Sequence, residues 1–374
     1  MKTYTIVVCF ALAFSFIACE KYSEEGPEEI AIDFTSNYTL FLENNNQLNT
    51  LVVSSVNEGM ILKNAGTSFT DIPLNSLKYR TSNDISFYYT RNCQAYLQWY
   101  NAFNGGNKSI ELFKNLDPCS IQVSAIAHTE DAVFIAYERE LLGKDKQYVI
   151  RLASLSEEND SFTEITLDKK PLDVISSLNR LFVLTLNEYI TDENHLSVID
   201  LSTNKNLIEL DLGYGASQLF TNNSGHIIVS YPTLHAILDP NTLDKSYTTY
   251  GANTEPGFFD SKDFYLDASD RLYFQKKTPS AAIESVPAIY DFEENSTVVY
   301  LYENFLSESE LNVKYSIGET TSIGYDKKRN FVLVGYRKQG QVDKGGILRI
   351  RPAPDFKIID NIDLEGVPNS IFVH

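Results

Sequence analysis

Tyrosine and a basic residue stand close together at several points of the chain, each time just after a short apolar segment. Three such pairs are Tyr89 with Arg91, Tyr137 with Arg139, and Tyr336 with Arg337. A tyrosine ring offers a flat contact area and a hydroxyl, and an arginine can bond a carboxylate with two parallel hydrogen bonds. The combination predicts a surface that binds a planar or aromatic anion.

Further tyrosines and a lysine occupy similar places in the repeat described below. The ligand-binding candidates are Tyr89, Arg91, Tyr137, Arg139, Tyr189, Tyr214, Tyr231, Lys276, Tyr336 and Arg337. The alternative is that these charges are simply solvated, since the chain holds 23 tyrosines and basic residues often end strands. No G-x-S-x-G or H-E-x-x-H motif is present, and the five histidines lack metal-ligand spacing. We therefore expect binding rather than catalysis, with no cofactor and no metal.

The elements that carry these residues recur along the chain as a polar turn followed by a short aliphatic and aromatic strand. Examples are "SSLNRLFVLT" at 176–185 and "DASDRLYFQK" at 267–276. Asn, Asp, Ser and Gly favour turns because they tolerate positive φ or bond their own backbone. One anchor residue per strand gives Phe41, Phe87, Phe134, Phe182, Ile228, Tyr273 and Val332. Successive anchors are 45 to 48 residues apart, with a last interval of 59, which predicts an all-β, seven-bladed β-propeller over 35–374.

The two ends of the chain complement each other. The second to seventh anchors each follow another apolar strand by about eight residues, whereas Phe41 has no such predecessor. The final stretch "GVPNSIFVH", at 366–374, resembles that missing strand. We expect the C-terminus to supply the innermost strand of the first blade, because this closure leaves no free sheet edge there. The candidates follow the second strands, so we expect them on the face where second and third strands join.

Later segments carry a more specific pattern. "LSVIDLSTNKN" at 196–206 and "HAILDPNTLDK" at 235–245 both read as an apolar strand, an Asp and a turn, and "EGVPNSI" at 365–371 reads as a Gly-Pro approach to a strand. At these residues the chain resembles the YVTN-type seven-bladed propellers. The resemblance covers most of the chain at low identity, and the second, third and sixth blades depart from the Asp-turn pattern.

The N-terminus has the order of an export signal. Lys2 precedes an apolar run, Ile6 to Ala18, that is too short to span a membrane. Cys19 follows it in a context that resembles the bacterial lipobox, although Phe16 stands where that family usually has Leu. We expect a lipoprotein signal peptide at 1–18 and an acidic flexible tether at 19–34, with lipid on the Cys19 thiol. An ordinary secretory signal is the alternative.

Composition limits the partners. The 374 residues carry a formal net charge of −19, which disfavours nucleic acid because phosphate binding needs a cationic surface. Beyond Cys9 and Cys19, only Cys93 and Cys119 remain. The blade map places both in loops of one face in adjacent blades. A disulfide is therefore possible in an oxidising compartment, with two buried free thiols as the alternative.

Three functions fit these features. The chain resembles surface propeller lipoproteins that capture siderophore- or cobalamin-like ligands for TonB-dependent outer-membrane transporters. That resemblance implies a lipid-anchored location on the outer membrane, contact with the membrane only through the anchor, and a transporter partner. A protein-interaction scaffold of the cell envelope is the second reading, and a propeller enzyme is the third.

Overall fold

The structure is a computed structural model that describes residues 35–374 except 57–58, 141–145, 156–160, 189, 252–253 and 262. The predicted signal peptide and tether, 1–34, lie outside the described residues, and with them Cys19. No helix in the described part of the chain is both long and apolar enough to cross a membrane.

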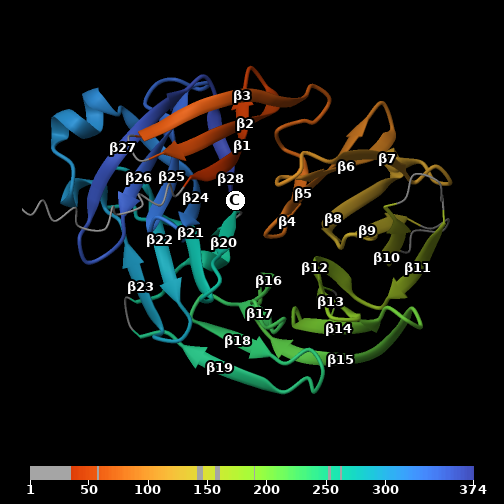
Figure 1. The fold of residues 1–374 in the computed structure, drawn as a ribbon. Coiled ribbons are helices and arrows are strands. Elements are labelled where there is room, and N and C mark those ends of the chain that lie inside the picture. Colours follow the sequence, from red (N-terminus) through yellow and green to blue (C-terminus); the bar gives the residue numbers. More distant parts are fainter. Residues whose placement is uncertain are drawn as a thin grey trace, which may run out of the picture. The chain divides into compact units, whose positions relative to one another are not determined.

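The described strands form seven four-stranded antiparallel sheets, arranged as blades around a common centre (Figure 1). Blade 1 contains, from the centre outwards, β28 (Val367–Val373), β1 (Ser36–Asn44), β2 (Gln47–Val56) and β3 (Gly59–Phe69). Blade 2 contains β4 (Leu77–Arg80), β5 (Asp84–Arg91), β6 (Gln94–Asn101) and β7 (Asn107–Leu112). Blade 3 contains β8 (Ile121–His128), β9 (Ala132–Glu140), β10 (Lys146–Ser154) and β11 (Phe162–Leu167). Blade 4 contains β12 (Lys170–Ser177), β13 (Arg180–Leu186), β14 (Asn194–Asp200) and β15 (Lys205–Gly213).

The remaining three blades follow the same order. Blade 5 contains β16 (Gln218–Thr221), β17 (Ile227–Ser230), β18 (Leu234–Leu238) and β19 (Lys245–Thr249). Blade 6 contains β20 (Phe264–Leu266), β21 (Arg271–Lys277), β22 (Ser285–Asp291) and β23 (Ser296–Val299). Blade 7 contains β24 (Ile317–Asp326), β25 (Phe331–Lys338), β26 (Gly345–Arg351) and β27 (Lys357–Leu364). Short helical turns lie in the loops between blades: η2 (Pro118–Ser120), η3 (Phe258–Asp260), η4 (Tyr302–Asn304) and η5 (Glu310–Lys314).

The predicted architecture is confirmed strand by strand. Every anchor residue lies in the second strand of its blade, as Phe87 does in β5 and Tyr273 in β21. The apolar strand that precedes each anchor is the innermost one. The long last interval reflects the loop between β23 and β24, which carries both η4 and η5.

Local turn chemistry sets the register of the hairpins. Asn45 and Asn46 alone connect β1 to β2, and both have positive φ, 50° and 59°. A two-residue hairpin turn of this kind suits Asn, whose short polar side chain tolerates the left-handed region. The turn brings Asn44 opposite Gln47 and so aligns the whole ladder.

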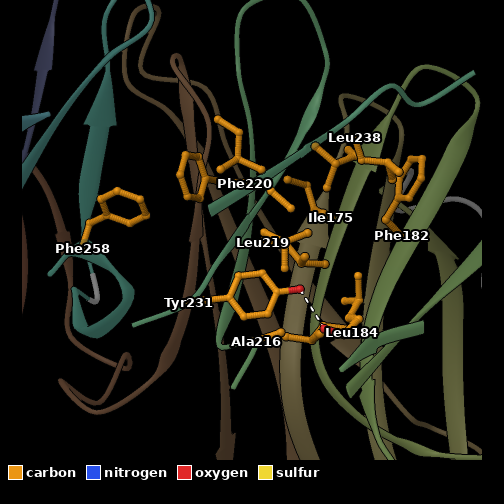
Figure 2. Close-up of a cluster of buried hydrophobic side chains, with 14 of the residues drawn as sticks. Ile175, Phe182, Leu184, Ala216, Leu219, Phe220, Tyr231, Leu238 and Phe258 are labelled. Atoms are coloured by element: carbon orange, nitrogen blue, oxygen red, sulfur yellow. Dashed lines mark hydrogen bonds between the residues drawn. The ribbon is translucent and has the colours of Figure 1, made fainter. Parts of the chain in front are cut away.

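The core consists of apolar layers between neighbouring blades. Figure 2 shows one such layer, in which Phe182 of blade 4 and Phe220 of blade 5 belong to a single buried cluster with Phe258 of η3. Each blade is thus covered on both faces, and alternate residues of its inner strands face one neighbour or the other. The free energy of burial is shared around the ring rather than concentrated in one core.

The predicted closure is also confirmed. The last strand, β28, pairs with β1 in an antiparallel ladder that places Ile371 opposite Leu40 and Phe372 opposite Thr39. Both of these β28 side chains are buried. N- and C-terminal strands therefore share blade 1, and the ring has no open edge at that point.

Candidate functional site

A cavity of about 460 Å³ opens among strands of blades 6, 7, 1 and 2. Its wall includes Lys277 and Ser285, at the joined ends of β21 and β22, and Val367 at the start of β28. It therefore lies on the face where second and third strands are connected. The charged residues that line it are Glu43, Lys78, Asp263, Lys276, Lys277, Glu319 and Arg337.

Strand alternation decides which candidates reach the cavity. In β25, Tyr336 is fully buried, and its hydroxyl donates to Asp363 Oδ1 at 3.3 Å. The next residue, Arg337, points the other way and lines the cavity. Arg337 forms ion pairs with Glu319 at 3.1 Å and with Glu43 at 3.9 Å.

Two consecutive lysines end β21, and both line the cavity. Lys276 donates hydrogen bonds through Nζ to the carbonyl oxygens of Glu255 and Pro256, the latter at 2.8 Å. Burial lowers the pKa of the Lys276 ammonium, and the nearby Glu255 opposes this shift. Lys277 is exposed. Among the described residues, neither lysine forms an ion pair with a carboxylate, so this end of the cavity carries positive charge that is available to a ligand.

A second charged group lies at the inner strands. Lys78 Nζ is 3.5 Å from Asp263 Oδ1, and Arg80 Nη1 is 3.9 Å from the same oxygen. The side chains of Arg80 and Asp263 are 8% and 9% exposed, whereas that of Lys78 is 24% exposed. Burial lowers the pKa of Arg80, while the charge of Asp263 raises it. Two cations here share one carboxylate.

Four of the predicted ligand tyrosines belong to the packed core. The exposed fractions are 7% for Tyr89, 0% for Tyr137, 6% for Tyr231 and 0% for Tyr336. The Tyr231 hydroxyl donates to the carbonyl oxygen of Leu212 at 3.1 Å within the layer between blades 4 and 5 (Figure 2). Burial raises the pKa of all four phenols. These four rings fill space between blades, where neighbouring residues cover them.

The remaining candidates lie away from the cavity. Arg91 pairs with Asp71, and both side chains are half exposed. Arg139 pairs with Glu164 at 3.2 Å. Tyr214 is 66% exposed on the loop after β15, and Tyr189 lies outside the described residues. Of the nine candidates that the structure describes, only Lys276 and Arg337 line the cavity.

The residue-by-residue prediction missed Lys78, Asp263, Glu43 and Glu319. Lys78 and Glu319 lie on innermost strands, where the sequence shows a polar residue inside or next to an apolar segment. Polar residues on the strands nearest the axis were the available signal, because those side chains can face the central opening. Asp263 and Glu43 carry no such signal in the sequence.

Cys93 and Cys119 form a disulfide in this structure, with their Cα atoms 5.1 Å apart. Cys93 lies in the turn between β5 and β6, and Cys119 lies in η2 before β8, so the bond joins loops of blades 2 and 3. Both residues are exposed. Together with Asp117 they form the one group of three potential metal ligands found in the described ranges, and both sulfur atoms belong to the disulfide.

Comparison with known proteins gives the fold. No family model and no curated protein sequence matches the chain. Among solved structures, a candidate 6-phosphogluconolactonase from Bacteroides uniformis aligns with a TM-score of 0.53 and 11% identity, over 91% of this chain and 99% of the other. The chain is a seven-bladed β-propeller. A Lactobacillus plantarum protein aligns with a TM-score of 0.52 and 10% identity, over 91% and 99% of the two chains.

The apo form of AztD from Citrobacter koseri is a third similar structure. It aligns with a TM-score of 0.50 and 11% identity, over 91% of this chain and 98% of AztD. Identities this low show the shared propeller fold and carry no residue roles. The YVTN-type pattern remains a resemblance in the repeat.

Proposed function

We propose that this propeller binds a small anionic ligand in the cavity lined by blades 6, 7, 1 and 2. The observation that carries the proposal is that Lys276 and Lys277 both line the cavity and that neither forms an ion pair with a carboxylate among the described residues. The backbone carbonyls that hold Lys276 fix its position, so the ammonium is preorganised for an anion.

The size of the cavity narrows the ligand. A volume of about 460 Å³ is within the usual range for small-molecule sites, roughly 300–1,000 Å³. Cobalamin is larger than such a cavity, so a compact anion fits the site better than a cobalamin-like ligand. Most of the lining residues carry polar or charged side chains, which suits a hydrophilic molecule.

We further propose that the protein works in the cell envelope, anchored by lipid at Cys19, and that it passes its ligand to a TonB-dependent transporter. The signal-like segment before Cys19 supports the export step. The disulfide between Cys93 and Cys119 is compatible with an oxidising compartment. Crosslinking in cells, followed by identification of the captured membrane proteins, tests the transporter partner; capture of an envelope assembly complex instead would favour the scaffold reading.

Ligand capture tests the central proposal. Purified protein is incubated with spent growth medium, washed, and its retained small molecules are identified by mass spectrometry. We expect the wild type and the Lys205→Ala control, an exposed lysine on the outer strand β15, to retain the same anion. The double variant Lys276→Ala/Lys277→Ala should lose it. Retention of nothing by the wild type, or equal retention by the double variant, would refute this site.

A further inference from the structure

We propose that the ligand is a compact dicarboxylate, with one carboxylate at Lys276 and Lys277 and the other at Lys78. This inference rests on the proposed function, because it assigns the chemistry of the same cavity. Lys276 bonds the backbone carbonyl oxygens of Glu255 and Pro256, within the loop that leads into β20, and Lys78 pairs with Asp263, the residue just before β20. Both lysines line the cavity from different blades.

The group around Asp263 lacks one negative charge. Arg80 is buried, and its Nη2 atom donates to the carbonyl oxygen of Ile371 while its guanidinium stacks 4.2 Å from the ring of Phe372. Its Nη1 atom is buried and has no hydrogen-bond partner among the described residues. Arg80 and Lys78 therefore depend on one carboxylate, although buried charges are stable only when they are paired.

Lys78 is the member of this group that a ligand can reach, since its side chain is 24% exposed and lines the cavity. If a ligand carboxylate paired with Lys78, the Asp263 carboxylate could pair with Arg80 alone. Each cation would then have its own anion, and the buried guanidinium would be better compensated. Binding of one anionic group at Lys78 would thus supply the negative charge that the group around Asp263 lacks.

The other cations that line the cavity, from blades 6 and 7, are also unevenly matched. Arg337 is matched by two carboxylates, Glu43 and Glu319, whereas Lys276 and Lys277 are matched by none in the described ranges. Glu255 lies near enough to Lys276 for its charge to oppose the effect of burial on that lysine, so Lys277, which is exposed, is the cation here that has no carboxylate of its own among the described residues. Lys277 comes from blade 6 and Lys78, which shares its carboxylate with Arg80, comes from blade 2. Two cations on different blades favour a molecule with two separate anionic groups over a single phosphate, which would place both charges at one point.

Direct binding measurements test this inference. Isothermal titration with succinate, glutarate and adipate is compared with butyrate, a monocarboxylate, and with inorganic phosphate. We expect at least one dicarboxylate to bind roughly ten- to a hundredfold more tightly than butyrate, because a hydrogen-bonded charge pair is worth that factor. Lys78→Gln should reduce dicarboxylate affinity to the butyrate level and leave butyrate binding almost unchanged. The control Lys205→Gln should change neither.

Several outcomes would overturn the dicarboxylate assignment: no binding of any dicarboxylate, equal affinity for butyrate, tighter binding of phosphate, or no effect of Lys78→Gln. If Lys78→Gln does not fold, Lys277→Gln, at the exposed lysine of the other end, gives the same comparison. If the medium screen yields another anion that needs Lys276 and Lys277 while dicarboxylates fail, only this inference falls. If that screen yields no ligand at all, the proposed function falls with it.

Discussion

The ring of Phe41, in the first strand of the propeller, lies 5.9 Å from the ring of Phe372, in the last strand. Phe41 also stacks on Phe69 and meets the edge of Tyr100, so the C-terminal strand completes an aromatic cluster shared by blades 1 and 2. Both phenylalanines are buried. The two ends of the chain are thus joined by side-chain packing as well as by the ladder between β1 and β28.

Removal of residues 366–374 should destabilise the entire propeller. The deletion exposes the edge of β1 and removes the buried side chains of Val367, Ile371 and Phe372, each worth about 1.5–3 kcal/mol of burial free energy. We expect a loss of at least about 5 kcal/mol of unfolding free energy, measured by chemical denaturation. A milder variant, Phe372→Ala, should cost about 3–5 kcal/mol. Phe356→Ala, at a ring that is 39% exposed, is the control and should cost clearly less.

The disulfide should stabilise the protein. A bond between residues 26 positions apart contributes about 3–4 kcal/mol in the chain-entropy model, so Cys93→Ser/Cys119→Ser should lower the unfolding free energy by that order. Reducing agent should lower the stability of the wild type and leave that of the double variant unchanged. A thiol assay on denatured, unreduced protein should detect neither cysteine; two reactive thiols from these positions would mean that the bond is absent in the isolated protein.

Acid should destabilise the fold in part through His128. Its ring is 2% exposed, its Nδ1 lies 2.7 Å from Ser86 Oγ, and burial lowers its pKa to about 4. The folded state therefore disfavours the protonated ring, and the resulting stability is complete above the unfolded pKa of about 6.5 and is lost as the pH falls towards 4. His128→Gln should reduce the pH dependence of the unfolding free energy in this window by on the order of 3 kcal/mol.

Its matched control is His226→Gln, because the His226 side chain is 39% exposed. Denaturation at several pH values between 4 and 7 gives the slopes for the wild type and both variants. The same slope in the wild type and in His128→Gln would show that His128 titrates alike in the folded and unfolded states. Asp173 opposes His128 in this window, since burial raises its pKa to about 6, so only differences between variants isolate the histidine.

Lipid attachment should depend on a single thiol. Cys19→Ser removes the only atom at this position that can carry a thioether-linked lipid, and we expect the variant to lose labelling by a radioactive fatty acid and to leave the detergent phase. Cys9→Ser, within the predicted signal, is the control and should label as the wild type does. Persistent labelling of the Cys19 variant would favour an ordinary secretory signal.

The sequence was sufficient for the fold because propeller blades are local units. Each blade is built from four strands that are consecutive in the chain, so its turns and alternating apolar residues repeat at a readable interval. The exception, blade 1, was also visible, since Phe41 lacks a preceding strand and 366–374 has no partner of its own. The pairing of β28 with β1 satisfies both ends.

The tertiary structure decided which side chains face the cavity. From their positions after the anchor residues, Tyr137 and Tyr336 were predicted to contact a ligand. Both are buried, because a blade is covered on each face by its neighbours. The alternation of residues along a strand shows which side chains share a face, but it does not show which neighbouring residues each face contacts. Lys78 of blade 2 and Asp263, next to blade 6, come from distant parts of the chain, and only the closed ring of blades brings their charges around one space.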